Sequence, residues 1–410
     1  MDLSTFQDLL SPHGQEALGA AMSLQPREED FLRDFTSLSR RFPAQLSRAA
    51  LETAILRAKA VDKFPLANRL YFTREALEQA SSWEIARHRS QRYHPFPLLA
   101  DLGCSIGGDT LALGNTAPTI GVELDPLRLQ MARANAEAFE LTDRISFVQA
   151  DLTKPIPFST SSQLALFFDP SRRKEAKRIY SVRNYHPPLN VILHWLDHFP
   201  ALGVKVSPGI NLSQVDSYDA EIEFISLRGE LKEAVLWFGP LKTVHRRATI
   251  LPGPFVMIDK RFSQLRGQTT LARFNLPLSI PRAFIYEPDP AVMRSGLVAD
   301  LGTLLNAFQL DPEIAYLTTD KFMPTPFANA WEIEGWFPFG LKRLRSYLRE
   351  RHVGQVTVKK RGSPLQPEAL IRDLRLKGED ERILFLTQLE GRPIVVVCMP
   401  IRSPKAFKDA

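Results

Sequence analysis

The sequence predicts an α/β fold in which a central parallel sheet is covered by helices, with a helical domain before it and an α+β domain after it. Three observations lead to this prediction. Residues 96–252 alternate short apolar strands with helical segments, which is the pattern of a parallel sheet with helices on both faces. Residues 1–95 repeat apolar side chains at spacings of three and four, as helices do, and the residues after a proline-rich stretch mix both patterns. We therefore expect domains at 1–95, 96–255 and 275–410.

The N-terminal domain is predicted to be helical until shortly before Pro95. Thr73 is a good N-cap for the helix REALEQA, and Ser81 or Ser82 for the helix WEIARHRSQRY. Proline disfavours the helical conformation of the residue before it, so Pro95 marks the end of this domain. The apolar spacing of a longer helix is carried by Leu46, Ala49, Ala50, Ala54 and Leu56.

Five short apolar runs predict the strands of the central sheet, and two amphipathic runs between them predict covering helices. The predicted strands are LLADLG, TIGVEL, ISFVQAD, LALFFDP and GVKVSPG. The predicted helices are DPLRLQMARANAEAFE and PLNVILHWLDHF. EIEFISL and EAVLWFG are expected to close the sheet, with one of the two a candidate for antiparallel pairing. The proline-rich residues 251–290 are expected to be a linker.

Composition excludes several classes of protein. With 410 residues, of which 44% are hydrophobic and 24% charged, the chain has the composition of a globular protein. No stretch approaches the about 20 apolar residues of a membrane span, and the first residues do not resemble a secretory signal. Cys104 and Cys398 are too few for a disulfide framework or a cysteine metal site, and the histidines form no ligand-spaced cluster, so we expect no metal and a reducing cytoplasm.

A glycine-rich turn follows the first predicted strand in DLGCSIGGDT. A dinucleotide site uses G-x-G-x-x-G, whose middle glycine lets the pyrophosphate approach the backbone. Gly103 and Gly108 hold the outer places here, with Gly107 beside them, but Ser105 holds the middle one. Asp101 would repel a diphosphate and suits a positively charged ligand. S-adenosylmethionine fits these features, because it carries a sulfonium and an ammonium and no phosphate.

Two further acids end the next two predicted strands. Glu123 lies twenty residues after Gly103, where a carboxylate binds both ribose hydroxyls of either a nicotinamide or a methyl-donor cofactor. Asp151 ends the third strand and is placed to accept from an adenine amino group. The carboxyl edge of an open parallel sheet is where such folds bind their ligands. We expect Asp101, Gly103, Gly107, Glu123 and Asp151 to bind S-adenosylmethionine.

Several motifs resemble those of a known family. DLGCSIGGDTLAL, VELDPLRLQMARANAEAFELTDRISFVQADL and FFDPSRR resemble the glycine, ribose, adenine and catalytic motifs of class I S-adenosylmethionine-dependent methyltransferases, which have a Rossmann-like fold. WEIARHRSQRY resembles a helix of their trimethylguanosine-synthase-like branch. YEPDPAVMRSG, IAYLTTD, WEIEGWFPFGLKRL and VTVKKRGSP resemble the THUMP-like domain of certain bacterial methyltransferases. The resemblance implies the cofactor and the architecture, and it is weak for the substrate.

The fourth predicted strand ends in Asp169-Pro170-Ser171-Arg172. Methyltransferases of amino groups commonly place an Asp, Asn or Ser here, followed by Pro-Pro and an aromatic residue. The polar side chain and a backbone carbonyl accept hydrogens from the amine, and the ring stacks on the base. In this chain the acceptors are retained, but a guanidinium replaces the ring, and it can stack on a base or bind a phosphate. We expect Asp169, Pro170 and Arg172 to be the catalytic residues.

Two concentrations of basic residues predict a polyanionic partner. The loop 171–183 holds six basic residues and one acid, and the segment 341–377 holds eleven Lys or Arg against three acids, in a chain of net charge +6. Solvated faces, or ion pairs with acids of another domain, are the alternatives. We expect RNA to bind these regions and a base nitrogen to receive the methyl group. A small-molecule or protein acceptor, or an RNA-binding relative without catalysis, stays open.

Three other places are weaker candidates for the site. The segment Lys205-Val206-Ser207-Pro208-Gly209 lies at the end of the fifth predicted strand, and it either shapes the substrate side or is a structural turn. Glu230 or Glu233 is a candidate base, although a surface turn is the favoured interpretation. Phe72, Gln79 and Ser82 would cover the cofactor if the helical domain folds over the sheet edge.

Overall fold

The computed structural model describes residues 1–170, 173–174, 177–178, 181–259 and 276–400. The chain divides into two compact units. The first contains Met1–Glu221 and Glu233–Thr243, and the second contains Ile222–Lys232 and Val244–Ala410. The sequence-based division into three domains stays a prediction.

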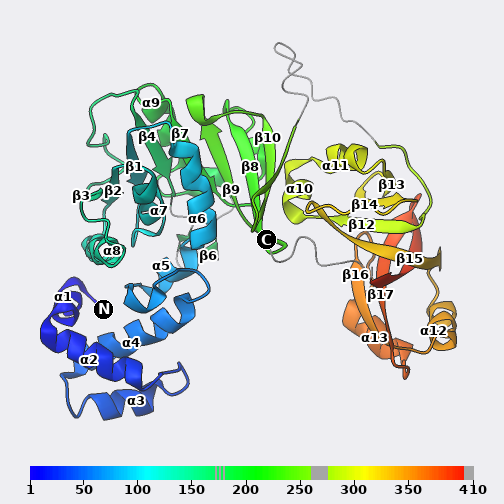
Figure 1. Ribbon diagram of the computed structural model, residues 1–410, viewed down its shortest axis with the longest axis horizontal. Coiled ribbons are helices and arrows are strands. Elements are labelled where there is room, and N and C mark those ends of the chain that lie inside the picture. The colour runs from blue at the N-terminus through cyan, green and yellow to red at the C-terminus, as the bar shows by residue number, and fades with distance from the viewer. Residues whose placement is uncertain (171–172, 175–176, 179–180, 260–275, 401–410) are drawn as a thin grey trace. The chain divides into compact units, whose positions relative to one another are not determined.

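The first unit begins with six helices, as the apolar spacing predicts (Figure 1). They are α1 (Leu3–Leu10), α2 (Pro12–Ser23), α3 (Phe31–Leu38), α4 (Ala44–Ala60), α5 (Arg74–Gln79) and α6 (Trp83–Ser90). Thr73 caps α5 as predicted, because its hydroxyl accepts from the N–H of Ala76 over 3.1 Å. Ser82 is the N-cap of α6, although its side chain makes no capping hydrogen bond. A 3-10 turn over Gln91–Tyr93 leads from α6 toward the sheet.

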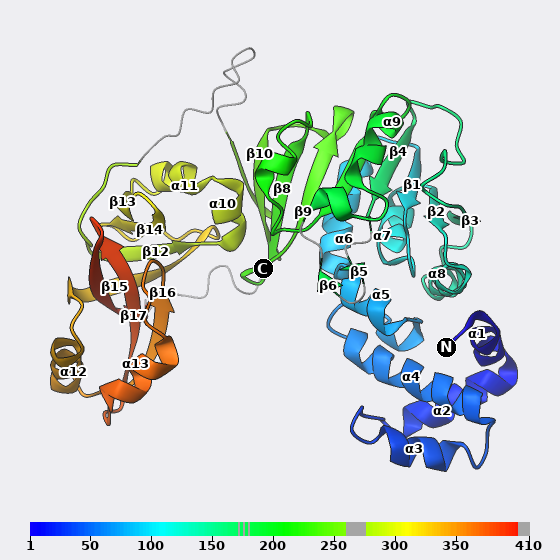
Figure 2. The same ribbon diagram turned by 180° about the vertical axis from the view of Figure 1, so that it is seen from behind.

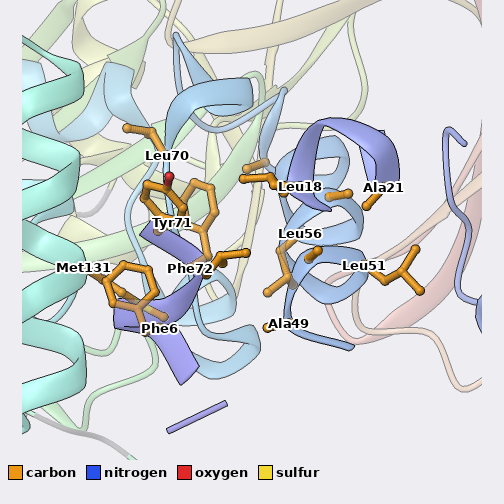
Figure 3. Close-up of a cluster of buried hydrophobic side chains, with 14 of the residues drawn as sticks. Phe6, Leu18, Ala21, Ala49, Leu51, Leu56, Leu70, Tyr71, Phe72 and Met131 are labelled. Carbon is orange, nitrogen blue, oxygen red and sulfur yellow. The ribbon is translucent and has the colours of Figure 1, made fainter. Parts of the chain in front are cut away.

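The helices of the N-terminal region share one apolar core with a helix of the sheet region. Figure 3 shows Met131, from α8 (Pro126–Ala138), beside Phe6 of α1, with Tyr71 and Phe72 on the same cluster. Met131 and Phe6 are fully buried. The side chain of Asn135, also on α8, adds hydrogen bonds to both backbone groups of Tyr71, accepting from the N–H over 2.8 Å and donating to the carbonyl over 3.0 Å. The N-terminal region is therefore tied to the sheet region by packing and by hydrogen bonds.

The sheet of the first unit contains the five predicted strands and one more. Its strands are β1 (Leu98–Leu102), β2 (Thr119–Glu123), β3 (Ile145–Gln149), β4 (Leu164–Phe168), β7 (Leu202–Val206) and β9 (Glu230–Phe238). They follow the order β9-β7-β4-β1-β2-β3. The pairs from β3 to β7 are parallel, and β9 runs antiparallel to β7, as was allowed for one closing strand. Because the order reverses between β1 and β4, the carboxyl edge there is the expected place for a ligand.

Helices cover both faces of this sheet. The helices α6, α7 (Gly108–Thr116) and α8 lie on the face that carries Asp101, and α9 (Ile192–Leu196) lies on the other face. Correspondingly, α6 is in front of the sheet in Figure 1, and α9 is in front of it in Figure 2. Trp195 of α9 packs edge-on against Phe168 with ring centroids 4.9 Å apart. The arrangement is the α/β layering that the sequence predicts.

The second unit contains two groups of strands. β8 (Glu221–Leu227), β10 (Arg246–Leu251) and β11 (Phe255–Ile258) follow the order β11-β10-β8. The other group is a seven-stranded sheet of order β13-β14-β12-β15-β18-β17-β16. Its strands are β12 (Phe284–Pro288), β13 (Phe308–Asp311), β14 (Ile314–Thr319), β15 (Ala328–Pro338), β16 (Val353–Lys360), β17 (Asp380–Leu389) and β18 (Arg392–Pro400).

Four helices accompany these strands, and two short strands complete the described elements. The helices are α10 (Pro290–Ser295), α11 (Val298–Leu304), α12 (Leu341–Glu350) and α13 (Pro367–Leu374). In the first unit, β5 (Arg173–Lys174) pairs with β6 (Lys177–Arg178). None of the described helices is long and apolar enough to cross a membrane.

The linker prediction over 251–290 is wrong at both of its ends. β11 pairs with β10 through a ladder that includes Met257, and β12 pairs with two neighbouring strands through Ile285. Prolines between these strands produced the linker signal, since proline is compatible with the ends of strands as well as with loops.

Candidate active site

The register of the sheet aligns four residues across one face. Asp101 of β1 is paired with Phe167 of β4, and Phe167 with Gly203 of β7. Gly203 is in turn paired with Trp237 of the antiparallel strand β9. Directly paired residues point to the same face of a sheet. The face that α6 covers therefore carries this row.

A second row lies two residues further toward the carboxyl ends, and it contains Gly103, Asp169 and Lys205. The ladder reaches this point, because the N–H of Asp169 donates to the carbonyl of Leu102 over 3.3 Å. A Cβ on Gly103 would lie 3.1 Å from the carbonyl oxygen of Asp169. The Nζ of Lys205 donates to Oδ2 of Asp169 over 2.6 Å. The glycine turn and the predicted catalytic acid are thus in contact, and the pairing adds Lys205 to them.

The turn after β1 depends on left-handed backbone conformations. Gly103 has φ +81° and Gly107 has φ +85°, and a side chain at either place would be strained. Ser105, in the middle place, is also left-handed, with φ 49°. Its N–H donates to Oε2 of Glu123 over 2.9 Å. The acid at the end of β2 therefore holds the turn in place.

Asp101 is a buried carboxyl group with one oxygen unused. The side chain of Thr110 donates to its Oδ2 over 2.6 Å, whereas Oδ1 is buried without a hydrogen-bond partner among the described residues. Burial, together with the charges of Asp109 and Asp169, raises the pKa of Asp101 to about 8, against the hydrogen bond from Thr110. An orphaned carboxylate oxygen of this kind fits a cationic ligand.

Glu123 and Asp151 end β2 and follow β3, and both carboxylates accept local hydrogen bonds. Oε1 of Glu123 accepts from the N–H of Leu124 over 2.8 Å and from that of Asp125 over 2.9 Å. Oδ1 of Asp151 accepts from the hydroxyl of Thr153 over 2.7 Å and from its N–H over 2.9 Å, and these bonds lower the pKa of Asp151. Asp151 is therefore ionised at neutral pH and can accept a further donor.

A buried arginine that the sequence interpretation missed lies behind this edge. Arg89 of α6 is 2% exposed and forms ion pairs with Asp109 and, over 2.6 Å, with Glu233. Its guanidinium lies 4.7 Å from the ring centre of Phe167. Burial by itself would lower the pKa of Arg89, but the charges of Asp109, Glu233 and Asp169 outweigh it and raise the pKa. A basic residue in a helix with many polar residues gives no signal of such burial.

Glu233 is not the surface turn that the sequence favoured. It is 3% exposed on β9, and its Oε2 accepts from the hydroxyl of Ser81 over 2.9 Å. Glu230 is exposed and pairs with Lys232, which leaves no role for it at this edge. The ion pair with Arg89 and the hydrogen bond from Ser81 hold Glu233 in place, and its role as a base stays a prediction.

The N-terminal region reaches the same edge. The carbonyl of Gln79 accepts from Lys205 over 3.5 Å, and Ser82 is buried, with no partner for its hydroxyl among the described residues. A Cβ on Gly108 would lie 3.4 Å from the ring of Phe64 and 3.9 Å from the Cβ of Ala80. The junction of α5 and α6 therefore lies against the start of α7 and against β7.

The charges of this cluster favour a cation. Its carboxyl groups are Asp101, Asp109, Asp169 and Glu233, and its cations are Arg89 and Lys205. With Asp101 protonated, three carboxylates face two cations, and ionisation of Asp101 adds a fourth negative charge, so positive charge is in deficit in either state. Together with the oxygen of Asp101 that has no partner among the described residues, this deficit fits S-adenosylmethionine and not a diphosphate. The described residues contain no group of three or more His, Cys, Asp or Glu side chains that would hold a metal ion.

The remaining predicted residues have mixed outcomes. Pro170 is buried next to Asp169. Arg172 lies outside the described residues, and so does much of the basic loop 171–183. The stacking or phosphate contact expected of Arg172 stays a prediction.

The basic segment 341–377 lies on α12, β16 and α13 of the second unit, and only part of its charge is paired with acids. Arg351 pairs with Glu334 over 2.7 Å, and Lys359 and Arg361 pair with Glu287 over 2.6 and 3.6 Å. The other eight cations have no carboxylate within 4.0 Å in the described part of the chain. These eight are Lys342, Arg343, Arg345, Arg349, Lys360, Arg372, Arg375 and Lys377.

Family models match three parts of the chain. Residues 97–183 match the family described as RNA cap guanine-N2 methyltransferase. Residues 328–400 match the family described as THUMP domain-like, and residues 2–60 match a domain of unknown function. The first match contains the glycine turn and Asp169, and the second contains the basic helix α12.

Relatives and solved structures agree with these matches. Uncharacterized S-adenosylmethionine-dependent methyltransferases from two strains of Mycobacterium tuberculosis are 31% identical over 369 residues, which is 86% of this chain and 97% of theirs. Trimethylguanosine synthase of Schizosaccharomyces pombe is 27% identical over 97 residues, covering 22% of this chain and 41% of that protein. A crystal structure from Porphyromonas gingivalis W83, described as a methyltransferase, shares the fold, with a TM-score of 0.76 and 21% identity over 94% of this chain and 98% of that one.

The motifs at the strand ends, the charges of the candidate site and the relatives matched over 97% of their length agree on one assignment. The chain belongs to the S-adenosylmethionine-dependent methyltransferases and uses S-adenosylmethionine as its methyl donor.

Proposed function

We propose that the protein transfers a methyl group from S-adenosylmethionine to a base nitrogen of RNA. The observation that carries this proposal is the close approach of the glycine turn to Asp169. A Cβ atom on Gly103 would lie only 3.1 Å from the carbonyl oxygen of Asp169. A cofactor turn and an amine-accepting carbonyl at that separation suit an in-line transfer. The family model that covers both groups is described as RNA cap guanine-N2 methyltransferase, which supports a base as the acceptor.

The cofactor is held in this proposal by Asp101, Gly103, Gly107, Glu123 and Asp151. Asp101 faces the positive charge, and the two glycines keep the turn free of side chains. Glu123 and Asp151 accept from the ribose hydroxyls and the adenine amine, and each carboxylate has lone pairs beyond the local bonds it makes. S-adenosylmethionine supplies an electrophilic methyl carbon when it is bound.

The acceptor is aligned in this proposal by Asp169, Pro170 and Arg172. The carboxylate and the carbonyl of Asp169 accept hydrogens from the amine, which orients its lone pair toward the methyl carbon. The buried Pro170 rigidifies the backbone at that carbonyl. Arg172 binds the base or its phosphate. The nitrogen–carbon bond forms as the carbon–sulfur bond breaks, and the displaced electron pair stays on sulfur while the amine proton passes to Asp169 or to water.

RNA is the proposed partner because eight cations of the segment 341–377 have no carboxylate within 4.0 Å among the described residues, and they lie on the THUMP-like part of the chain. Arg345 of α12 donates to the carbonyl of Asp373 over 2.5 Å, and Arg349 donates to that of Arg375 over 3.2 Å. These bonds place the second half of α12 beside the end of α13, where Arg372 is exposed. Unpaired cations on adjoining elements suit a phosphate chain.

The methyl-transfer proposal is tested with tritiated S-adenosylmethionine and purified RNA pools. Native protein is expected to label RNA, and Asp169→Ala is expected to abolish labelling while the cofactor affinity, measured by calorimetry, stays nearly unchanged. Asp197→Ala removes an exposed aspartate of the same unit and serves as the control. No label in any RNA pool would refute the proposal, and native labelling by Asp169→Ala would refute the role of Asp169.

The RNA-binding part is tested by a salt series. Arg372, Arg375 and Lys377 are changed together to Gln, and Arg40, Arg41 and Arg48 of the first unit are changed together as a charge-matched control. The first variant is expected to bind RNA more weakly, with a slope of log K against log salt that is smaller by about 2, at about 0.7 for each phosphate that is no longer neutralised. An equal weakening in both variants would mean that net charge, and not this surface, binds RNA.

Domain organisation and location remain parts of this proposal. Three domains at 1–95, 96–255 and 275–410 are supported by the three family models, each of which falls inside one of them. A cytoplasmic location rests on the two cysteines, which are free and buried.

A further inference from the structure

We propose that Lys205 is a positioning residue for methyl transfer, which holds the carboxyl group of Asp169 ionised and in a single orientation at the acceptor side of the candidate site. This inference rests on the role proposed above for Asp169.

The position of Lys205 is unusual for a lysine. It lies on β7, where every residue from Leu202 to Val206 is buried, and its own side chain is 3% exposed. Two acceptors surround the ammonium group. Oδ2 of Asp169 is 2.6 Å away, and the carbonyl of Gln79 is 3.5 Å away. A buried ammonium needs such partners, because its removal from water is costly unless other groups replace the hydration.

The register explains why these two side chains meet. Phe168 is paired with Val204 in the parallel ladder between β4 and β7, so that Lys205 is the partner of Asp169 one residue further on. Side chains of such partners lie on the same face at about 5 Å between Cβ atoms. The lysine therefore reaches the acid without a bend in either strand, and this contact is built into the sheet.

Stability alone does not account for this pair. A buried ion pair is often no more stabilising than apolar residues of the same volume, since desolvation offsets the attraction. The neighbouring positions of β7 are filled by Leu202, Val204 and Val206, which are apolar. Lys205 and Asp169 are the exceptions where the two strands reach the carboxyl edge, which is the edge that binds ligands in this class of sheet.

The other charged groups around Asp169 make this cation necessary. Arg89 approaches from α6, but its guanidinium forms ion pairs with Asp109 of α7 and Glu233 of β9. Asp101 approaches from β1, and repulsion between its carboxylate and that of Asp169 contributes to the raised pKa of Asp101, so two ionised acids here disfavour each other. Without Lys205, Asp169 would face these acids with less compensation, and it would bind a proton more readily. A protonated Asp169 accepts fewer hydrogens from an amine.

Gln79 extends the same arrangement into the N-terminal helical region. Its carbonyl follows the last turn of α5 and accepts from the lysine. The ammonium is therefore held between the N-terminal region and β4. The helical region therefore contributes to the site by orienting Lys205, which in turn orients Asp169.

The first experiment separates positioning from a merely structural role. Lys205→Met is expected to lower kcat by ~10²-fold, the size of effect that a small misplacement of a reacting group produces, with little change in the KM for S-adenosylmethionine. Lys205→Arg is expected to restore part of the rate, because it keeps the charge. Lys242→Met is the matched control, since Lys242 forms a different ion pair of the same unit, with Asp219. It is expected to keep the native kcat.

A double variant tests whether Lys205 acts through Asp169. In an Asp169→Asn background, where the neutral amide still accepts a hydrogen bond and a residual rate can be measured, Lys205→Met is expected to cause no further loss of rate, because the carboxylate charge that Lys205 holds is already absent. An equal further loss in that background would overturn the proposal, as would native kcat in Lys205→Met. If Lys205→Met does not fold, as judged by its melting temperature, Lys205→Gln replaces it in the same comparison, because it keeps an N–H donor and removes the charge.

An NMR titration of Asp169 in the absence of RNA tests this inference independently of the proposed function, because it requires no methyl transfer. Protein labelled with ¹³C at the aspartate carboxyl groups is titrated by NMR, and Asp169→Asn identifies the signal of Asp169. Lys205→Met is expected to move the midpoint of this signal to higher pH, and Lys242→Met is expected to leave it in place. An unchanged midpoint in Lys205→Met overturns the inference. Absence of RNA labelling by the native protein would refute the proposed function and leave this result standing.

Discussion

At the scale of the residue, Asp101 links cofactor binding to pH. Its pKa, raised mainly by burial to about 8, means that the free protein carries a largely protonated Asp101 at neutral pH. A cationic ligand binds the ionised form better, so binding below pH 8 includes the loss of a proton. We expect the affinity for S-adenosylmethionine to rise by up to about tenfold per pH unit from pH 6.5 to 8 and then to level off, as calorimetry at several pH values would measure.

Two variants check that Asp101 is the group responsible. Asp101→Asn is expected to bind more weakly and to lose this pH dependence, whereas Asp197→Asn, at an exposed position, is expected to keep it. Equal native affinities at pH 6.5 and 8.5 would show that Asp101 does not face the positive charge of the ligand.

Gly103 allows a test of the close approach between the turn and Asp169. Gly103→Ala adds a methyl group 3.1 Å from the carbonyl of Asp169 at φ +81°, and Gly229→Ala adds one in open space at the nearly equal φ of +80°. Both are expected to lose about 1–2 kcal/mol of stability from the left-handed conformation. Only Gly103→Ala is expected to lose methyl transfer by more than tenfold as well. Equal activities in the two variants would contradict the proposed alignment.

Sequence patterns located the acids at the strand ends but not their partners. Asp101, Glu123 and Asp169 each follow an apolar run, and the ends of parallel strands share one edge, so their neighbourhood was predictable. The pairing of Lys205 with Asp169 depends on a register that links residues 36 positions apart. The burial of Arg89 depends on which face α6 turns toward the sheet. Neither leaves a periodic signal in the local sequence.

At the scale of the element, α8 holds the N-terminal region and the glycine turn together through one side chain. Asn135 is 1% exposed, exchanges two hydrogen bonds with Tyr71 and donates to the carbonyl of Ile106 over 2.9 Å. Asn135→Ala leaves these buried groups unpaired, at a cost of about 1–3 kcal/mol for each. We expect a lower free energy of unfolding and a weaker affinity for S-adenosylmethionine.

Asn115 provides the comparison for that variant. It is exposed on α7 and, among the described residues, its side chain donates to the carbonyl of Leu111 within its own helix over 3.0 Å. Asn115→Ala is expected to change stability by less than about 0.5 kcal/mol in denaturant titrations. If both variants unfold at the same denaturant concentration, α8 does not connect the two regions in the way the hydrogen bonds indicate.

Most elements were predictable because their signals are local. The helices α4 and α8 and the strands β1 to β4 follow their apolar periodicity, and Thr73 caps α5 as expected. The prolines between 251 and 290 misled the prediction, since strands β11 and β12 begin and end beside them. Proline has no backbone N–H to donate, and it is therefore found at the ends of strands as well as in linkers.

At the scale of the whole molecule, cofactor binding is expected to act on one unit. All of the proposed cofactor residues lie within Met1–Glu221 of the first unit. Scanning calorimetry is therefore expected to show two unfolding transitions, and S-adenosylmethionine is expected to raise the melting temperature of only one of them. At one hundred times its dissociation constant, the ligand adds about 2.7 kcal/mol to the free energy of unfolding of that unit. A single transition, or an equal shift of two, would mean that the units unfold together. Asp101→Asn, which weakens cofactor binding, is the control that should show a smaller shift.

The sequence by itself determined the succession of strands and helices along the central part of the chain and the class of cofactor. It also determined the position in the chain of Asp169, the acid that is proposed to align the acceptor. Periodicity and strand-end residues are local properties, so they can be read along the chain. Only the tertiary structure decided that Lys205 holds Asp169, that Arg89 joins Asp109 to Glu233, and that the N-terminal helices reach the sheet edge. The physical reason is that buried charges choose partners by strand register and helix placement, which bring together residues far apart in the chain.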